Sequence, residues 1–129
     1  MQTFFFIKSG HKFARINFGD IIYVEGLKNY VRIVTAQKKH TALTTLKQVE
    51  RHFPPHLFCR VHRSYIVALN AITGFTHAEV YLGNISLPVG AVYKKILHGK
   101  VLIITQEPLG AESLGAAFVA NSPVRASCL

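Results

Sequence analysis

The sequence is poor in acidic residues, and this shortage is its clearest compositional feature. It holds 6 Asp and Glu against 15 Lys and Arg among 129 residues, a formal net charge of +9. Residues 101–129 contain Glu107, Glu112 and Arg125, so residues 1–100 hold 4 acidic and 14 basic residues and carry +10. Such an excess implies an anionic partner, most simply nucleic acid. A basic surface that serves only solubility is the alternative.

Cysteines and long apolar runs are also scarce. The two cysteines, Cys59 and Cys128, lie far apart in the sequence and form no CxxC pair. The apolar run Phe4–Ile7 is short and is followed by charge, which is typical of a strand and not of a secretory segment. No run approaches the roughly 18 apolar residues that a membrane span requires. These absences predict free thiols in a reducing, cytoplasmic setting and no membrane partner.

Motifs for catalysis and for cofactor binding are missing as well. The sequence contains no GxSxG, no phosphate-binding glycine loop and no HExxH. His62 and Ser64 can share a strand face, but no acid lies nearby in the sequence to orient the histidine. His52, His56 and Cys59 are metal-ligand types, but two prolines interrupt their spacing and no fourth ligand stands out. We therefore expect no enzyme activity, no metal, no cofactor and no small-molecule substrate.

The residues that are present indicate a folded domain built mainly from short strands. Half of them are hydrophobic and 11% are aromatic. Short apolar or alternating runs, separated by turn residues, predict a series of strands. The expected strands cover residues 4–8, 12–18, 21–25, 30–35, 38–44, 71–76, 79–82 and 85–87, with a strand-and-turn segment at 58–67. Val101–Thr105 is one further candidate strand.

Two short helices are expected between these strands. Thr45–Gln48 fits a capping box at the start of a helix that two prolines end after Phe53. A second helix is predicted over Ala91–Leu97, with Tyr93, Ile96 and Leu97 facing the core and Gly99 as its C-terminal stop. The predicted fold is therefore mainly β, with antiparallel sheets of about ten short strands and two short helices.

The chain is expected to form one domain with an extension. Residues 1–100 hold all the predicted elements apart from the candidate strand at 101–105. Residues 109–129 are rich in Ala, Gly and Ser and have almost no charge. We predict a domain over residues 1–100 and a poorly ordered C-terminal extension over residues 101–129.

The stretch Phe58–Val67, which reads FCRVHRSYIV, concentrates positive charge among strand-forming residues. Arg60, His62 and Arg63 lie within four positions, and each charge would need a partner if it were buried. A turn that faces a polyanion would accommodate all three, and the Ser64 hydroxyl can donate to a phosphate oxygen. We therefore expect this turn to face DNA. His62, with apolar neighbours, is expected to be structural.

These residues, with two earlier segments, resemble the LytTR DNA-binding domain, which is found at the C-terminus of many bacterial response regulators. The resemblance covers about residues 3–98. It rests on Asp20-Ile-Ile-Tyr-Val-Glu25, then Asn29-Tyr-Val-Arg-Ile33, a short helix that ends at Phe53, and Arg60-Val-His-Arg-Ser-Tyr-Ile-Val67. It implies antiparallel sheets that present loops, not a recognition helix, to successive major grooves on one face of double-stranded DNA.

The family pattern implies three DNA-contacting elements in this chain. They are the Lys28–Val31 loop, the Arg63-Ser64 turn and the Val89–Lys94 segment. The candidate DNA-binding residues are Lys28, Asn29, Tyr30, Arg60, Arg63, Ser64, Tyr93, Lys94 and Lys95.

The chain also departs from the family pattern. Family members often carry Arg just before the last helix, where this chain has Ala91, and some offer a polar side chain at the position of Val31. An alanine cannot form a bidentate contact with guanine, so base reading at the third element should be weak or absent. Lys28 and Asn29 lie on the same loop as Val31 and can substitute for it.

The resemblance predicts a sequence-specific transcription regulator of the two-component type, with a second copy of the chain on a repeated site. Family regulators usually carry an N-terminal receiver domain, and only one or two residues precede the first strand here. The chain is thus expected to be a stand-alone regulator or the output half of a longer protein. The alternative is a LytTR-derived protein-interaction module that modulates a partner regulator and reads little DNA itself.

Overall fold

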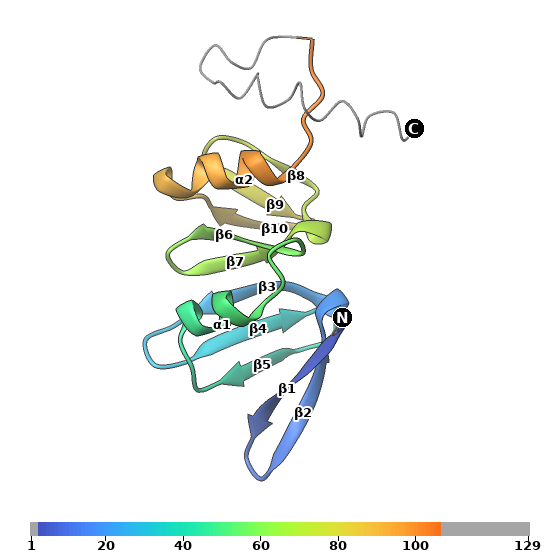
Figure 1. Cartoon of the computed structure of the whole chain (residues 1–129), viewed down its shortest axis with the longest axis vertical. Coiled ribbons are helices and arrows are strands. Elements are labelled where there is room, and N and C mark those ends of the chain that lie inside the picture. The colour runs from blue at the N-terminus through green and yellow to red at the C-terminus, as the bar shows by residue number, and fades with distance from the viewer. Residues whose placement is uncertain (1–2, 107–129) are drawn as a thin grey trace.

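Three antiparallel sheets follow one another along the long axis of the molecule (Figure 1). The computed structural model describes residues 3–106, and these form ten strands and two α-helices. The predicted mainly β class, with short antiparallel strands and two short helices, is therefore confirmed.

The first sheet is a hairpin of β1 (Phe4–Ser9) and β2 (Lys12–Asn17), paired without a register shift. Gly10 has a φ of 67° in its turn, a backbone conformation that L side chains rarely adopt. Alternate side chains of this hairpin face the rest of the protein. Ile16 is buried, whereas Phe6 and Phe13 lie on the outer face and are exposed.

The central sheet has five strands in the order β5-β4-β3-β7-β6. These are β3 (Ile21–Gly26), β4 (Val31–Thr35), β5 (Lys39–Ala42), β6 (Phe58–His62) and β7 (Tyr65–Ala68). Strand β3 lies in the middle and pairs with both β4 and β7. A central strand covered on both faces explains why residues 21–25 read as a nearly continuous apolar run.

The third sheet has the order β10-β9-β8, and the second helix lies beside it and packs against β6 of the central sheet. Its strands are β8 (Gly74–Phe75), β9 (Glu79–Leu82) and β10 (Ile85–Pro88). A 3₁₀ turn, η3 (Ala91–Tyr93), leads directly into α2 (Lys94–Lys100). The predicted strand over residues 71–76 is reduced to Gly74–Phe75, because residues 69–71 form a 3₁₀ turn.

Helix α1 (Leu46–His52) begins where the sequence predicts. The Thr45 hydroxyl oxygen accepts a hydrogen bond of 3.2 Å from the Gln48 amide, as expected for an N-cap residue. Leu46 and Val49 are buried and pack the helix onto the central sheet. The Phe53 amide closes the last turn on the Val49 carbonyl before the two prolines.

Two apolar clusters fill the spaces on either side of the central sheet. One lies beneath β1, β2 and α1, where Phe5, Phe18, Phe53 and Phe58 have ring centroids 4.7 to 5.8 Å apart. The other joins β6 and β7 to the third sheet and to Leu97 of α2. The central sheet therefore holds together all three parts of the domain.

Three expectations for the end of the domain are wrong. Gly99 lies inside α2 and does not end it, since the helix continues to Lys100. Ile96 is 47% exposed because only one face of the short helix, centred on Leu97, meets the core. Residues 101–105 form no strand, because no strand edge pairs with them.

The predicted extension lies outside the described residues from 107 onward. Within residues 3–106, no helix is both long and apolar enough to cross a membrane.

Candidate nucleic-acid interface

The three predicted DNA-contacting elements lie on one side of the molecule. The β3–β4 loop, the β6–β7 turn and the start of α2 all point to the left in Figure 1. Antiparallel pairing explains the first two, because Glu25 near the end of β3 lies opposite Tyr65 at the start of β7. The connection leading into α1 emerges on the same side.

The β3–β4 loop is attached directly to the β6–β7 turn. The Gly26 amide donates a hydrogen bond of 2.8 Å to the Ser64 carbonyl oxygen. The Leu27 amide donates to the Tyr30 carbonyl oxygen, also at 2.8 Å, and closes the loop. Lys28 and Asn29 are exposed at its tip. Their side chains are therefore free to meet a ligand, whereas Tyr30 is half-buried.

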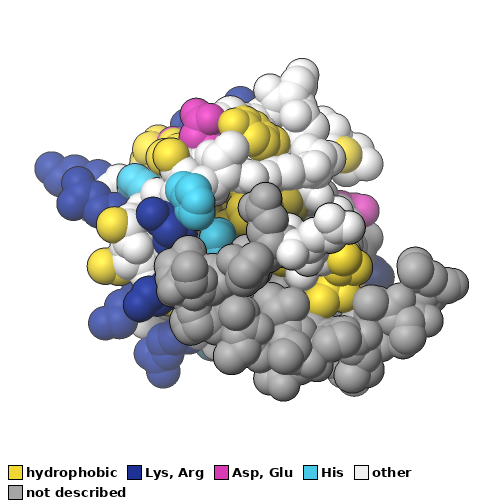
Figure 2. Space-filling view, turned by 90° about the horizontal axis from the view of Figure 1, so that it is seen from above, with side chains coloured by type: hydrophobic (Ala, Val, Ile, Leu, Met, Phe, Trp, Pro, Cys, Tyr) yellow, Lys and Arg dark blue, Asp and Glu magenta, His cyan; other side chains and the backbone are white. Residues whose placement is uncertain are grey.

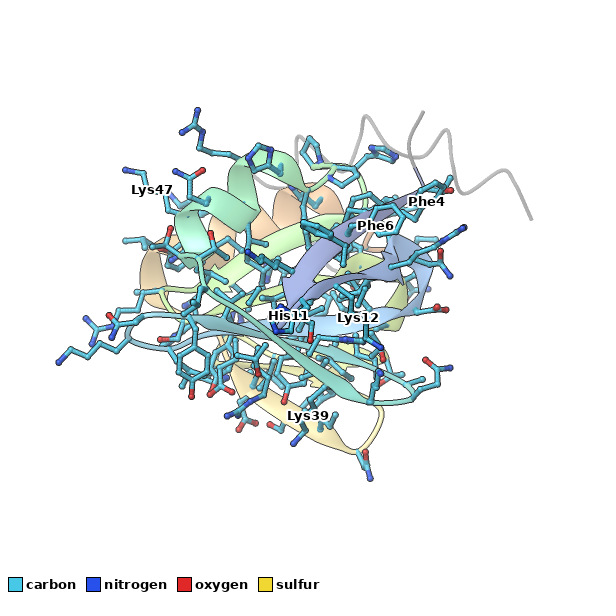
Figure 3. The ribbon with its side chains drawn as sticks, turned by 90° about the horizontal axis from the view of Figure 1, so that it is seen from below. Phe4, Phe6, His11, Lys12, Lys39 and Lys47 are labelled. Carbon is cyan, nitrogen blue, oxygen red and sulfur yellow. The ribbon has the colours of Figure 1, made fainter. Side chains whose placement is uncertain are left out.

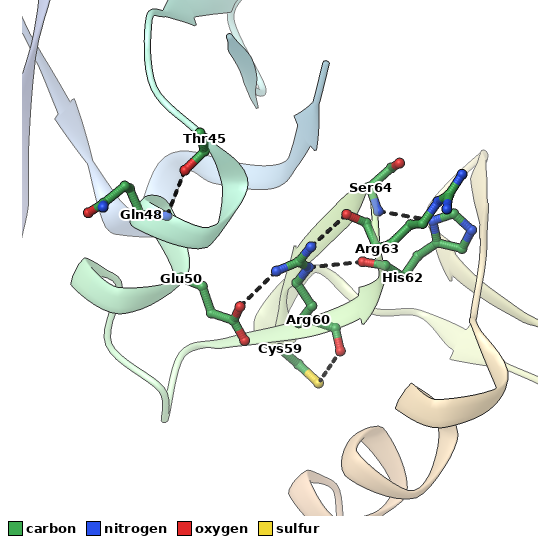
Figure 4. A network of polar contacts seen from close by, with 8 residues as sticks. All are labelled: Thr45, Gln48, Glu50, Cys59, Arg60, His62, Arg63 and Ser64. Carbon is green, nitrogen blue, oxygen red and sulfur yellow. Dashed lines mark hydrogen bonds and ion pairs between the residues drawn. The ribbon is translucent and has the colours of Figure 1, made fainter. Parts of the chain in front are cut away.

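The β6–β7 turn is held by the side chain of His62. Its Nδ1 accepts a hydrogen bond of 3.1 Å from the Ser64 amide (Figure 4). This agrees with the structural role expected for His62. Arg63, between them, is exposed, and no hydrogen bond of its guanidinium occurs within the described residues. The Arg63 side chain is thus presented to solvent by an ordered turn.

Arg60 is placed differently from Arg63, although both were predicted to contact DNA. Its guanidinium donates to the His62 carbonyl at 3.0 Å and the Arg63 carbonyl at 2.6 Å, and pairs with Glu50 at 2.8 Å (Figure 4). Its side chain is only 16% exposed. Sequence spacing does not reveal this partner, because Glu50 lies ten positions away on α1.

The third element is attached to the same turn through the backbone. The Gly90 amide donates a hydrogen bond of 2.7 Å to the Val61 carbonyl oxygen. The Tyr93 ring lies near the Arg60 guanidinium, at 5.9 Å from centroid to carbon. Tyr93 and Lys94 are half-buried, and Lys95 is exposed. The hydrogen-bonded β6–β7 turn therefore lies between the first and third elements.

Positive charge follows the side on which these elements lie. Seen from above, most of the visible Lys and Arg side chains gather on the left, which is the loop side of Figure 1 (Figure 2). The loop side is therefore suited to binding an extended anion.

Within residues 3–106, no cluster of three His, Cys, Asp or Glu side chains could hold a metal ion.

Lys47 belongs to this side and was not among the predicted residues. It lies in the first turn of α1, is exposed, and extends toward the loop side, whereas Lys39 and the hairpin residues His11 and Lys12 lie elsewhere (Figure 3). A Cβ added to Gly26 would lie 3.1 Å from the Leu46 Cβ, so the start of α1 abuts the β3–β4 loop. The start of α1 and the β3–β4 loop are far apart in the sequence, so only the packing of α1 shows that they are close.

Comparisons with known proteins agree with this architecture. A sequence model of the LytTr DNA-binding domain matches residues 11–101. The structure resembles the LytTr DNA-binding domain of a putative methyl-accepting/DNA response regulator from Bacillus cereus, with a TM-score of 0.65 and 22% identity. That match covers 76% of this chain and 95% of the other. The chain belongs to the LytTR DNA-binding domain family.

Two longer proteins share this segment. The CO-responsive transcriptional regulator RcoM of Rhodospirillum rubrum is 41% identical over 59 residues, which are 46% of this chain and 25% of that protein. The sensory transduction protein LytT of Bacillus anthracis is 31% identical over 88 residues, which are 64% of this chain and 36% of that protein. The matched segment is thus about a quarter to a third of each relative.

Proposed function

We propose that this LytTR domain reads DNA sequence for a transcription regulator of the response-regulator type, with its loops in successive major grooves on one face of a duplex. The observation that carries the proposal is the pair of backbone hydrogen bonds, Gly26 to Ser64 and Gly90 to Val61. They join all three loop elements on the side where Lys and Arg gather.

The roles of the side chains follow from their chemistry together with their exposure. Four groups bind phosphates and so set the register of the domain on the duplex. They are the side chains of Lys28, Lys94 and Lys95 and the hydroxyl of Ser64. Asn29 and Arg63 read bases, because an amide and a guanidinium each offer a bidentate pattern worth about 1–3 kcal/mol of discrimination. Tyr30 and Tyr93, both half-buried, support the first and third elements.

Two positions limit what one copy can read. Val31 is fully buried in the core, so the first loop must read bases through Lys28 and Asn29. Ala91 is exposed but offers no side-chain hydrogen bond at the third element. One domain, residues 1–100, should therefore bind modestly, and two copies on a directly repeated or inverted site would supply the missing specificity.

Selection of bound fragments from a random duplex pool tests this function. We expect a preferred sequence to emerge, with affinity that falls steeply as salt rises. Arg63→Ala should lower affinity for that sequence and relax the preference at one base position. Lys95→Ala should weaken binding to all sequences alike and flatten the salt slope. If Arg63→Ala binds every probe as well as the parent does, the base-reading role of Arg63 is wrong.

A protein-interaction module that modulates a partner regulator is the second candidate. Ala91 favours it, because the third element presents a methyl group where a base reader would carry a donor. A gel shift with random genomic fragments across a salt series separates the two. Preferred fragments with steep salt dependence support the regulator, and no shift at low salt supports the interaction module.

A further inference from the structure

The environment of Arg60 differs from that of a DNA-contacting arginine. A guanidinium has five N–H donors in a rigid fork, and here its Nε, Nη1 and Nη2 each bond to a different acceptor inside the protein. Two acceptors are carbonyls of the β6–β7 turn, at His62 and Arg63, and the third is Glu50 of α1 (Figure 4). A phosphate would have to compete with these three bonds.

We infer that Arg60 is a positioning residue that fixes the β6–β7 turn, and that Glu50 anchors Arg60 from α1. This inference rests on the proposed function, because the turn that Arg60 fixes presents Arg63. By bonding to the carbonyls of His62 and Arg63, the guanidinium defines the backbone on both sides of the Arg63 side chain.

The energetics favour a geometric role over a stabilising one. The Glu50 side chain is 50% exposed, and ion pairs with an exposed partner contribute little to folding. The pair does, however, prevent the Arg60 side chain from rotating toward a passing phosphate. Lysine could not replace it, since one ammonium on a flexible stem cannot hold two carbonyls and a carboxylate in the same planar arrangement.

The same side chain also reaches the third element. The Tyr93 ring lies 5.9 Å from the Arg60 carbon, and the Gly90 amide bonds to the carbonyl of Val61, the next residue after Arg60. A change at Arg60 is thus transmitted to η3 as well as to the β6–β7 turn. Glu50 in the second half of α1, the β6–β7 turn and η3 all contact this one guanidinium or its immediate backbone.

Removal of the Glu50 carboxylate distinguishes this role from direct phosphate binding. If Arg60 bound phosphate, Glu50→Ala would free the guanidinium and remove a repulsive charge, so DNA affinity would rise. If Glu50 anchors a positioning residue, Glu50→Ala loosens the turn, and discrimination between sites falls. Glu79→Ala is the matched control, since it removes an exposed carboxylate whose one hydrogen bond among residues 3–106 comes from the Tyr81 hydroxyl, and it leaves Arg60 untouched.

The experiment combines DNA binding with amide hydrogen exchange in the free protein. For Glu50→Ala, Arg60→Lys and Arg60→Gln, we expect discrimination between the selected site and a single-base variant to fall about tenfold, with the salt slope unchanged. The Ser64 amide, which bonds to His62 Nδ1, should exchange faster in all three variants and not in Glu79→Ala.

Several outcomes would overturn the inference. One is tighter binding by Glu50→Ala with full discrimination. Another is an Arg60→Gln salt slope lower by about 0.9 with Arg60→Lys unaffected, which would mark a phosphate contact. Unchanged Ser64 exchange in every variant would also refute it. If the parent selects no DNA, the proposed function fails, while the exchange data still decide whether Arg60 orders the turn.

Discussion

The Gly26 amide and the Ser64 carbonyl oxygen lie 2.8 Å apart and form a hydrogen bond that joins two loops separated by more than thirty residues in the sequence. The bond lies where β3 ends and β7 begins, so the pairing of these two strands fixes the spacing of the loops. Gly26 also touches α1, because its Cα faces Leu46. A single backbone position therefore sets the relative placement of the β3–β4 loop, the β6–β7 turn and α1.

Gly26→Ala should disturb this placement and weaken DNA binding. The new Cβ would lie 3.1 Å from the Leu46 Cβ and 3.3 Å from its Cδ2, so α1 must move by a few tenths of an ångström. Leu46 is buried, and overpacking of this kind costs about 1–3 kcal/mol. Denaturant unfolding measures the loss of stability, and titration of the selected duplex measures the loss of affinity.

Gly19→Ala is the control for that substitution. Nothing lies within 4 Å of a Cβ added to Gly19. The same chemical change should therefore leave both the unfolding free energy and the DNA affinity close to those of the parent. Equal effects at the two glycines would show that contact with Leu46 is not the cause.

Local sequence signals sufficed for most of the fold and for only part of the site. Each predicted hairpin and the cap of α1 depend on residues within a few positions of one another, so spacing alone reveals them. The role of Arg60 depends on Glu50, which α1 brings close only through packing onto the sheet. Lys47 was missed for the same reason, because its nearness to the β3–β4 loop is a tertiary contact.

The errors at the end of the domain have a related cause. Gly99 reads as a stop because glycine is common after helix ends, yet it lies within α2. Residues 101–105 have strand propensity, but a strand also needs a free edge to pair with, and sequence does not show which edges are free. Tertiary context therefore overrode a local preference in both places.

The position of Gly99 inside α2 predicts that Gly99→Ala stabilises the protein. Glycine costs about 0.5–1 kcal/mol relative to alanine in a helix interior, and nothing lies within 4 Å of the added Cβ. Because Gly99 is the second-last residue of α2, thermal or denaturant unfolding should show a gain of at most that size.

Gly83→Ala is the opposite case. Its φ of 70° in the β9–β10 turn strains any L side chain, so that variant should be less stable than the parent.

The Cys59 thiol should be unreactive in the folded protein. Burial raises the pKa of the Cys59 thiol; Lys100 partly offsets this by lowering the pKa, and Glu50 adds a smaller upward contribution. The residue is 1% exposed, so a reagent cannot reach the sulfur. In a Cys128→Ser variant, a thiol reagent should label no cysteine under native conditions and one after denaturation.

The raised pKa of Cys59 also has a consequence for stability. The unfolded chain loses this proton at a lower pH than the folded protein does, so unfolding becomes easier as pH rises through the ordinary thiol range. The contribution is fully present below that range. Cys59→Ala removes the thiol and with it this part of the fall in unfolding free energy at alkaline pH. Unfolding curves recorded below and above the thiol pKa would show the difference.

In the labelling experiment on Cys128→Ser, rapid reaction of the native protein would contradict the assigned burial of Cys59.

Lys47, which emerged only from the packing of α1, supplies the sharpest test of which side of the molecule meets DNA. Lys47→Ala should lower affinity for all duplexes alike and reduce the salt slope by about 0.9, the loss expected for one phosphate contact on duplex DNA. Lys39→Ala removes the same charge from β5, away from the loop side (Figure 3). Because net charge falls equally in both variants, any difference between them reflects position. Equal slopes for the two variants would mean that the loop side has no special role, whereas a lower slope for Lys47→Ala alone would place the duplex against the start of α1.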